Sequence, residues 1–148
     1  MNRGTAEKLE EILHQEVPLT AHMGVRVAGC DGTELVVQAD LEPNINIHGT
    51  AFGGSLYAIC AITCWGFLHL KFQEAGVVAQ SVLADGGISY RLPVRGIIEA
   101  RCREPGDGQF AAFLDDVKGG RRSSVELQAD VMTDRGRAVI FKGRYSAC

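Results

Sequence analysis

The chain has 148 residues and a mass of 15.9 kDa, which is the size of one ordinary domain. Hydrophobic residues make up 46% of it and charged residues 22%, and these proportions exclude disordered, collagen-like and coiled-coil chains. The formal net charge is −3, so the basic excess that is typical of nucleic-acid-binding proteins is missing. We therefore expect a single domain over residues 1–148 that does not bind nucleic acid.

The charge is spread unevenly along the chain. Residues 1–75 carry four basic and nine acidic side chains, whereas residues 76–148 carry eleven and nine. Most of the later basic residues are arginines, whose planar guanidinium group suits phosphate and carboxylate. They could contact a phosphate-bearing small molecule or an acidic carrier protein, or they could simply be solvated. We expect part of one group to line the mouth of a substrate site: Arg91, Arg95, Arg121 and Arg122.

The five cysteines form an odd set without CxxC or Cys–His spacing. Cys60 and Cys64 share one helical face within an apolar run, which indicates small buried hydrophobic residues rather than ligands. The first 18 residues form a charged amphipathic pattern and not a signal peptide. The sequence thus predicts a reduced, cytoplasmic protein without a metal site.

The first predicted elements are a helix and a hairpin. Apolar residues at helical spacing predict a helix over residues 5–17, which Pro18 would end. Alternating residues predict strands around positions 25–27 and 35–41, with a turn at Asp31-Gly32. A loop should follow over residues 43–50.

Residues 51–70 contain no Asp, Glu, Lys or Arg. As a helix they would rise ~30 Å, which is enough to cross a bilayer. However, glycine and polar residues dilute the run, and amphipathic strand patterns lie on both sides of it. We therefore predict a buried core helix that the rest of the chain wraps, and no membrane span.

The residue pattern in the second half of the chain predicts four strands and one short helix. A long strand over residues 77–90 is interrupted at Gly86-Gly87 by a bulge or a close backbone contact. A strand over 98–103, a helix over 110–117 and two final strands within 125–145 complete the chain. Strands joined by short turns, with the helices segregated from them, predict an α+β domain with an antiparallel sheet.

The polar residues most suited to chemistry lie in the loop before the apolar helix. Asn44, Asn46, His48 and Thr50 cluster there, and Gly53-Gly54 follows in the first helical turn. A buried helix start has unpaired N–H groups that can polarise a carbonyl and stabilise an enolate or oxyanion, and glycines let a ligand approach them. The alternative is that Asn46 and Thr50 only cap the helix.

Three stretches of the sequence resemble a known family. They are PNINIHGTAFGGSL at 43–56, CWG at 64–66 and SYRLPV at 89–94. Together they resemble the hot-dog-fold thioesterase superfamily, and within it the branch called putative thioesterases, found alone or behind an acetyltransferase domain. Members of that branch are described as malonyl-ACP decarboxylases that feed fatty-acid initiation.

The resemblance implies a fold and a class of substrate. Residues 51–74 would be the central helix, wrapped by a curved antiparallel sheet, and two chains would form a dimer or a higher homo-oligomer with sites at the interface. The substrate would be a thioester of CoA or of acyl carrier protein (ACP). No cofactor would be needed beyond the CoA or phosphopantetheine of the substrate.

One departure from the superfamily bears on the reaction. Thioesterases of the phenylacetate-pathway type carry an acidic residue seven positions after the second glycine of their HGG motif, where this chain has Ala61. Water activation then has no obvious base, and Asp85 or His48 is the nearest substitute. We expect the catalytic residues to come from Asn46, His48, Thr50 and Asp85, with Asn46 the principal one. The expected substrate-binding residues are Gly49, Phe52, Gly53, Gly54, Ser55, Tyr90 and Arg91.

The missing acid leaves several functions open. Hydrolysis needs an activated water or a nucleophile, whereas decarboxylation of a malonyl thioester needs only donors to the thioester oxygen and an apolar place for the carboxylate. The third possibility is a non-catalytic module that binds acyl thioesters or carrier proteins.

Overall fold

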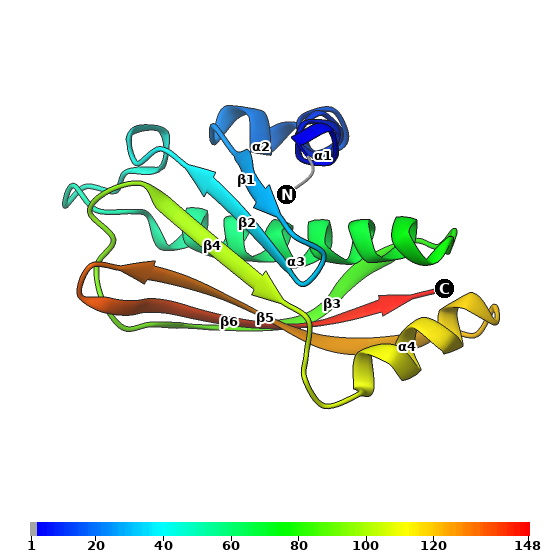
Figure 1. The fold of residues 1–148 in the computed structure, drawn as a ribbon. Coiled ribbons are helices and arrows are strands. Elements are labelled where there is room, and N and C mark those ends of the chain that lie inside the picture. Colours follow the sequence, from blue (N-terminus) through cyan, green and yellow to red (C-terminus); the bar gives the residue numbers. More distant parts are fainter. Residues whose placement is uncertain (1–2) are drawn as a thin grey trace.

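A six-stranded antiparallel sheet wraps around one long helix, α3 (Gly53–Ala75), in the computed structural model, which describes residues 3–148 (Figure 1). The strand order is β1-β2-β4-β5-β6-β3. The strands are β1 (Arg26–Cys30), β2 (Glu34–Ala39), β3 (Ser81–Tyr90), β4 (Ile98–Arg103), β5 (Ser123–Thr133) and β6 (Gly136–Ala147). The α+β class and the antiparallel sheet are confirmed.

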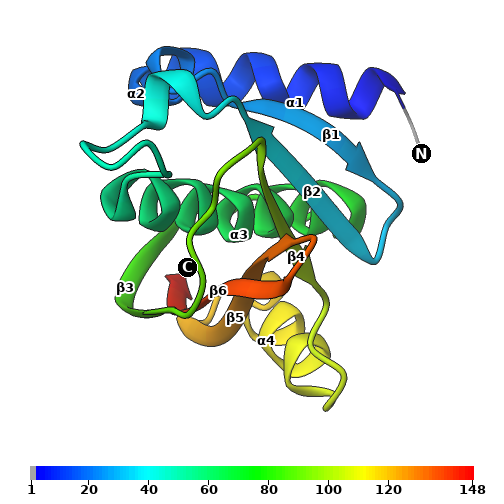
Figure 2. The same ribbon diagram turned by 90° about the vertical axis from the view of Figure 1, so that its left-hand side faces the viewer.

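The remaining helices lie on two sides of this assembly. Helices α1 (Arg3–Glu16) and α2 (Pro18–His22) lie beside β1 and β2 on one side of α3, while α4 (Gln109–Lys118) lies by β5 on the other (Figure 2). The prediction that the first helix ends at Pro18 is confirmed, since α1 ends at Glu16, but a second helix that was not predicted begins there. Pro18 is the first residue of α2, because proline has the backbone angle that a helix start requires and no N–H to leave unpaired.

Helix α3 is the core helix that the sequence predicted. It is long and apolar enough to cross a membrane by length and composition, but it packs against β2, β3, β4, β5 and β6 and gives no evidence of a membrane span. Ile59, Cys60, Cys64 and Leu68 are completely buried. One side of the helix is only half-buried within the single chain, along Ala58, Ala61, Ile62 and Trp65.

Strand β3 is an edge strand that pairs only with β6. Most of its residues are exposed on both faces, including Val82 and Leu83. Its bulge lies at Ala84, since the register shifts between Leu83 and Asp85, and not at Gly86-Gly87. The alternative prediction of a close contact holds at Gly86, where a Cβ would collide with the hydroxyl of Tyr57.

The cysteines are all free thiols. Cys60, Cys64 and Cys102 are buried in the core, and burial raises the pKa of Cys60 and Cys64. They pack as small hydrophobic residues. Within residues 3–148, no group of three or more His, Cys, Asp or Glu side chains could hold a metal ion.

Candidate functional site

The loop before α3 is held in place by Asn44, at the end of a short 3-10 helix (Glu42–Asn44). The Asn44 side chain is buried, and its Nδ2 donates to the carbonyl oxygens of Met23 at 2.9 Å and Asp40 at 2.8 Å. The Asn44 carbonyl accepts a 2.7 Å bond from the N–H of Phe52. Through its side-chain amide and its backbone carbonyl, Asn44 thus ties the start of α3 to two earlier segments, a role that the sequence analysis did not assign to it.

Asn46 organises the rest of the loop. Its Oδ1 accepts the backbone N–H groups of His48 at 2.8 Å and Thr50 at 3.1 Å. Its Nδ2 donates to Thr50 Oγ1 at 2.8 Å and more weakly to the carbonyl of Ala51 at 3.5 Å. Both ends of the amide are therefore engaged within the loop. The structure brings Asn46, His48 and Thr50 together, with His48 exposed and Gly49 at the turn with φ +79°.

The first turn of α3 leaves backbone donors open. The helix begins after Phe52, which provides no side-chain cap, and its first bond runs from the N–H of Leu56 to the carbonyl of Phe52. The N–H groups of Gly53, Gly54 and Ser55 are thus the unpaired donors of a helix start, where the helix dipole adds partial positive charge. This arrangement can stabilise a developing oxyanion.

Two aromatic rings lie close to the glycines of this turn. A Cβ on Gly54 would collide with the ring of Phe52, and a Cβ on Gly53 would lie 3.3 Å from the ring of Tyr90. The Tyr90 hydroxyl donates a 2.8 Å bond to the carbonyl of Gly53. Burial raises the pKa of Tyr90, so its phenol stays protonated and can act as this donor.

A surface hollow of about 350 Å³ opens beside this turn. Its lining includes three predicted residues, Gly53, Tyr90 and Arg91, together with Ala51, Leu56, Leu92, Pro93 and Val94, which the sequence analysis missed. Pro93 and Val94 belong to the SYRLPV stretch of the resemblance, which could have pointed to them. Of the described residues, those that line the hollow include no carboxylate and no histidine.

Asp85 does not join the loop. Gly86 faces α3, and successive strand residues point to opposite faces, so Asp85 points to the outer face of the sheet. There it is exposed and stands opposite Arg144 in the β3–β6 register. The position of the missing acid, Ala61, is half-buried on α3, and its carbonyl accepts a 2.7 Å bond from the Tyr145 hydroxyl.

The four arginines expected near the substrate do not form one group. Arg91 and Arg95 lie in the segment between β3 and β4, next to the start of α3. Arg121 and Arg122 precede β5, and Arg121 pairs with Asp116 at 3.2 Å. They lie at the N-terminal end of β5, whereas Arg95 lies beside its C-terminal end, and the eleven residues of this strand span about 36 Å.

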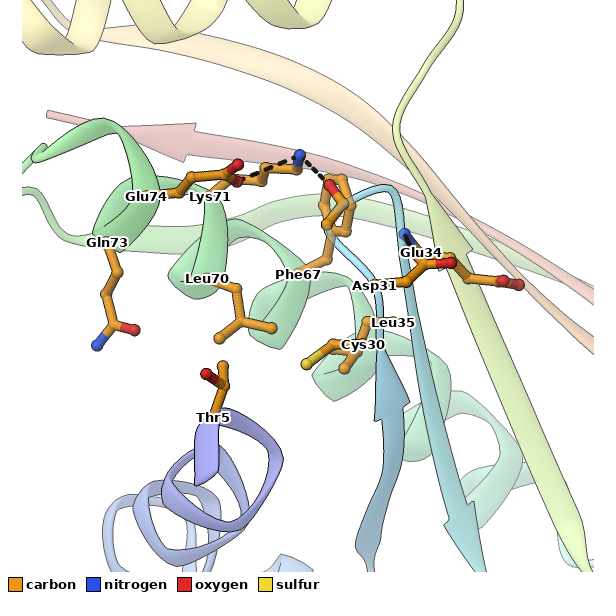
Figure 3. Close-up of a pocket in the computed structure, with 11 residues that line it drawn as sticks. Thr5, Cys30, Asp31, Glu34, Leu35, Phe67, Leu70, Lys71, Gln73 and Glu74 are labelled. Carbon is orange, nitrogen blue, oxygen red and sulfur yellow. Dashed lines mark hydrogen bonds and ion pairs between the residues drawn. The ribbon is translucent and has the colours of Figure 1, made fainter. Parts of the chain in front are cut away.

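A different cavity, of about 540 Å³, lies by the C-terminal half of α3 (Figure 3). Cys30, Leu35, Phe67 and Leu70 supply its apolar lining. On its wall, the ammonium of Lys71 bonds to the carbonyl of Gly32 and pairs with Glu74 at 3.5 Å and Glu104 at 3.2 Å. These contacts join α3 to the β1–β2 turn and to the segment after β4.

Comparisons with known proteins match this architecture. The family described as "Putative thioesterase (yiiD_Cterm)" matches residues 6–148. A crystal structure titled as a putative thioesterase from Shewanella oneidensis is 32% identical, with a TM-score of 0.90 and coverage of 98% of each chain. A Chlorobaculum tepidum protein whose title gives its function as unknown is 33% identical, with a TM-score of 0.90 and coverage of 96% of this chain and 93% of that one.

A more distant similarity shows the fold alone. The Escherichia coli PaaI protein from the phenylacetic acid degradation operon is 13% identical, with a TM-score of 0.65 and coverage of 96% of this chain and 92% of that one. The sheet wrapped around α3 is the hot-dog fold of these thioesterases, and the family supports an enzyme that acts on acyl thioesters. The chain belongs to the putative thioesterase family, across residues 6–148.

Proposed function

We propose that the chain is an enzyme that acts on acyl thioesters of CoA or acyl carrier protein at the start of α3. The observation that carries this proposal is the first turn of α3, where three backbone N–H groups have no helical partner beside a hollow lined by Tyr90 and Arg91. Family membership supplies the substrate class. The thioester carbonyl binds at these donors, which stabilise negative charge on its oxygen.

The residues around the hollow suit decarboxylation of a malonyl thioester better than hydrolysis. In decarboxylation the bond between the carboxylate carbon and Cα breaks, CO₂ leaves, and the electron pair forms an enolate whose oxygen charge the N–H groups stabilise. Cα then takes a proton from water to give an acetyl thioester. This route needs no general base in the enzyme, and the lining of the hollow offers none among the described residues.

Hydrolysis remains the second candidate because the family is one of thioesterases. Water would attack the thioester carbon and the thiol would leave with a proton. A base is required, and His48 is the predicted base that lies in the loop. The third candidate is a non-catalytic module that holds acyl thioesters or carrier proteins. It is supported by the hydrogen bonds of the Asn46 amide, both ends of which are already engaged within the loop and not directed at a substrate.

One experiment separates the three functions. The purified protein is incubated with malonyl-ACP and, in parallel, with malonyl-CoA, and the products are resolved by mass. Acetyl thioester means decarboxylation, free thiol means hydrolysis, and unchanged substrate supports a binding module. Asp85→Asn is the companion variant: since Asp85 points away from the loop, we expect unchanged turnover, and a large loss would restore Asp85 as the base of a hydrolase.

The exposed β3 edge supports a homodimer. Its unpaired backbone groups, with exposed Val78, Val82 and Leu83, and the half-buried side of α3 would both be covered by a second copy. The sites would then lie near the subunit interface. We expect a cytoplasmic dimer, or a higher oligomer built from it, that needs no cofactor beyond the CoA or phosphopantetheine of its substrate.

A further inference from the structure

A second hollow, of about 670 Å³, adjoins the one at the start of α3. The two share Pro93 and Val94 in their linings. Beyond these residues the second hollow is lined by Arg95 and Ile97 on one side and by residues 132–135, at the end of β5 and in the turn to β6, on the other. A molecule with its reactive end at Gly53 could therefore extend past Tyr90 and Pro93 into this second hollow.

The side chains of this second hollow combine apolar surface with unpaired cations. Ile97 is 57% exposed and Met132 is 46% exposed, so both present apolar surface that nothing covers. Within residues 3–148, neither Arg95 nor Arg135 has a carboxylate within ion-pair distance, whereas Arg26, Arg101 and Arg137 each pair with one. These two guanidinium groups are available to a ligand.

The second hollow also contains two acidic residues, Glu99 and Asp134. Glu99 accepts bonds from Gln38 at 2.7 Å and Arg101 at 3.0 Å, and the Gln38 bond is the main cause of its lowered pKa. Asp134 stands in the turn next to Arg135. The hollow is thus close to neutral overall, with two free cations at defined positions rather than a broad basic surface.

We infer that this second hollow binds the nucleotide end of a CoA thioester, an inference that rests on the proposed function. The purine ring lies against Ile97 and Met132, since a flat aromatic ring gains most from exposed apolar surface. Arg95 and Arg135 bind the phosphates, to which guanidinium groups donate paired, charge-assisted hydrogen bonds. The pantetheine arm lies along Tyr90, Pro93 and Val94, between the two hollows.

The same features favour CoA over an acidic carrier protein. A carrier protein that docks by long-range charge needs a surface with one sign of potential, and Asp134 and Glu99 interrupt it here. A concave site with a few placed polar groups is typical of a small-molecule site. CoA, with its diphosphate and 3′-phosphate, matches two separate guanidinium groups.

Binding of unacylated ligands tests the inference by calorimetry. Wild type, Arg95→Ala and Arg135→Ala are each titrated with CoA, 3′-dephospho-CoA and pantetheine. We expect each substitution to raise the Kd for CoA about tenfold and to leave that for pantetheine unchanged. In one of them CoA and 3′-dephospho-CoA should bind equally, which identifies the arginine at the 3′-phosphate. Arg122→Ala, an exposed arginine at the other end of β5, is the matched control and should bind CoA like wild type.

Three results would overturn the inference. They are an unchanged Kd for CoA in both variants, an equal loss with pantetheine, and an equal loss in Arg122→Ala. The same proteins are also titrated with a holo acyl carrier protein. If Arg95→Ala and Arg135→Ala weaken the binding of the carrier protein and not that of CoA, the inference is wrong and the surface is a carrier-protein site. Because these titrations need no turnover, CoA binding through both arginines without activity on any thioester would refute the proposed function and leave the nucleotide site standing.

Discussion

The two ends of α3 are built in opposite ways. At the C-terminal end, side chains satisfy one another: Lys71 joins three segments, and Phe67 and Phe72 pack on the aromatic rings of α4. At the N-terminal end, glycines replace side chains, no side-chain cap is present, and the backbone N–H groups of the first turn have no helical partner. One end of the same helix stabilises the fold and the other is free to bind.

The largest loss of stability is expected from a substitution in the buried middle of α3, on which both ends of the helix depend. Ile59 has no exposed surface, so Ile59→Glu would bury a carboxylate without a partner and lower the free energy of unfolding by more than about 3 kcal/mol. Urea denaturation measures this loss. Ile62→Glu, on the side of α3 that the proposed second copy would cover, should cost less than Ile59→Glu and should also weaken the dimer. Equal stability of Ile59→Glu and wild type would contradict the assignment of α3 as the core.

A second prediction concerns Asn46, in the loop before the N-terminal end of α3. Asn46→Ala removes the acceptor for two backbone N–H groups and the donor to Thr50, and we expect turnover to fall by roughly a hundredfold. Asn46→Asp keeps the acceptor and loses the donor. If Asn46 acts by shaping the loop, the Asp variant retains most of its turnover; if its amide contacts the thioester, both variants lose it. Steady-state rates, with circular dichroism to check folding, decide between these roles.

At the C-terminal end of α3, we expect a substitution to lower stability and leave turnover unchanged. Lys71→Met removes the mostly buried ammonium that Gly32, Glu74 and Glu104 share, and the Gly32 carbonyl loses a charged donor, so we expect a loss of about 2 kcal/mol in unfolding free energy. Turnover at a temperature well below the melting point should stay at the wild-type value. A fall in kcat without a fall in stability would show that the two ends are coupled.

The smallest effect is expected at Tyr90. Tyr90→Phe removes the bond to the Gly53 carbonyl and keeps the ring that packs on the helix start, at a cost of about 1 kcal/mol. We expect kcat/KM to fall several-fold with little change in melting temperature. A change in stability alone would place Tyr90 with the structural residues.

The sequence was most informative where periodicity was strong. The uncharged run at 51–70 predicted α3, and the alternation of strand residues predicted the sheet, because burial of one face or of all faces leaves a direct pattern. The position of the β3 bulge at Ala84 was missed because backbone register depends on the partner strand. Gly86 marked the contact with Tyr57 and not the bulge beside it.

The candidate site was only partly predictable. Gly53, Tyr90 and Arg91 line one hollow, but the other residues expected to bind substrate are not in its lining: Gly49, Phe52, Gly54 and Ser55. The separation of Arg121 and Arg122 from Arg91 and Arg95 could not be foreseen, since spacing along the chain does not say at which end of a strand a residue will lie. For the same reason, the outward direction of Asp85 follows only from the register of β3 on β6.

Asn44 has a consequence for how this site can change. Its amide meets the carbonyls of Met23 and Asp40, and its own carbonyl meets the N–H of Phe52, so the angle at which α3 begins is set by residues more than ten positions earlier in the chain. We expect a substitution in the turn at Gly24, which has φ +72°, to shift the start of α3 although Gly24 does not line the hollow there. The position of the helix start depends on the segments that follow α2 and β2, and variants selected for a new substrate should include positions there.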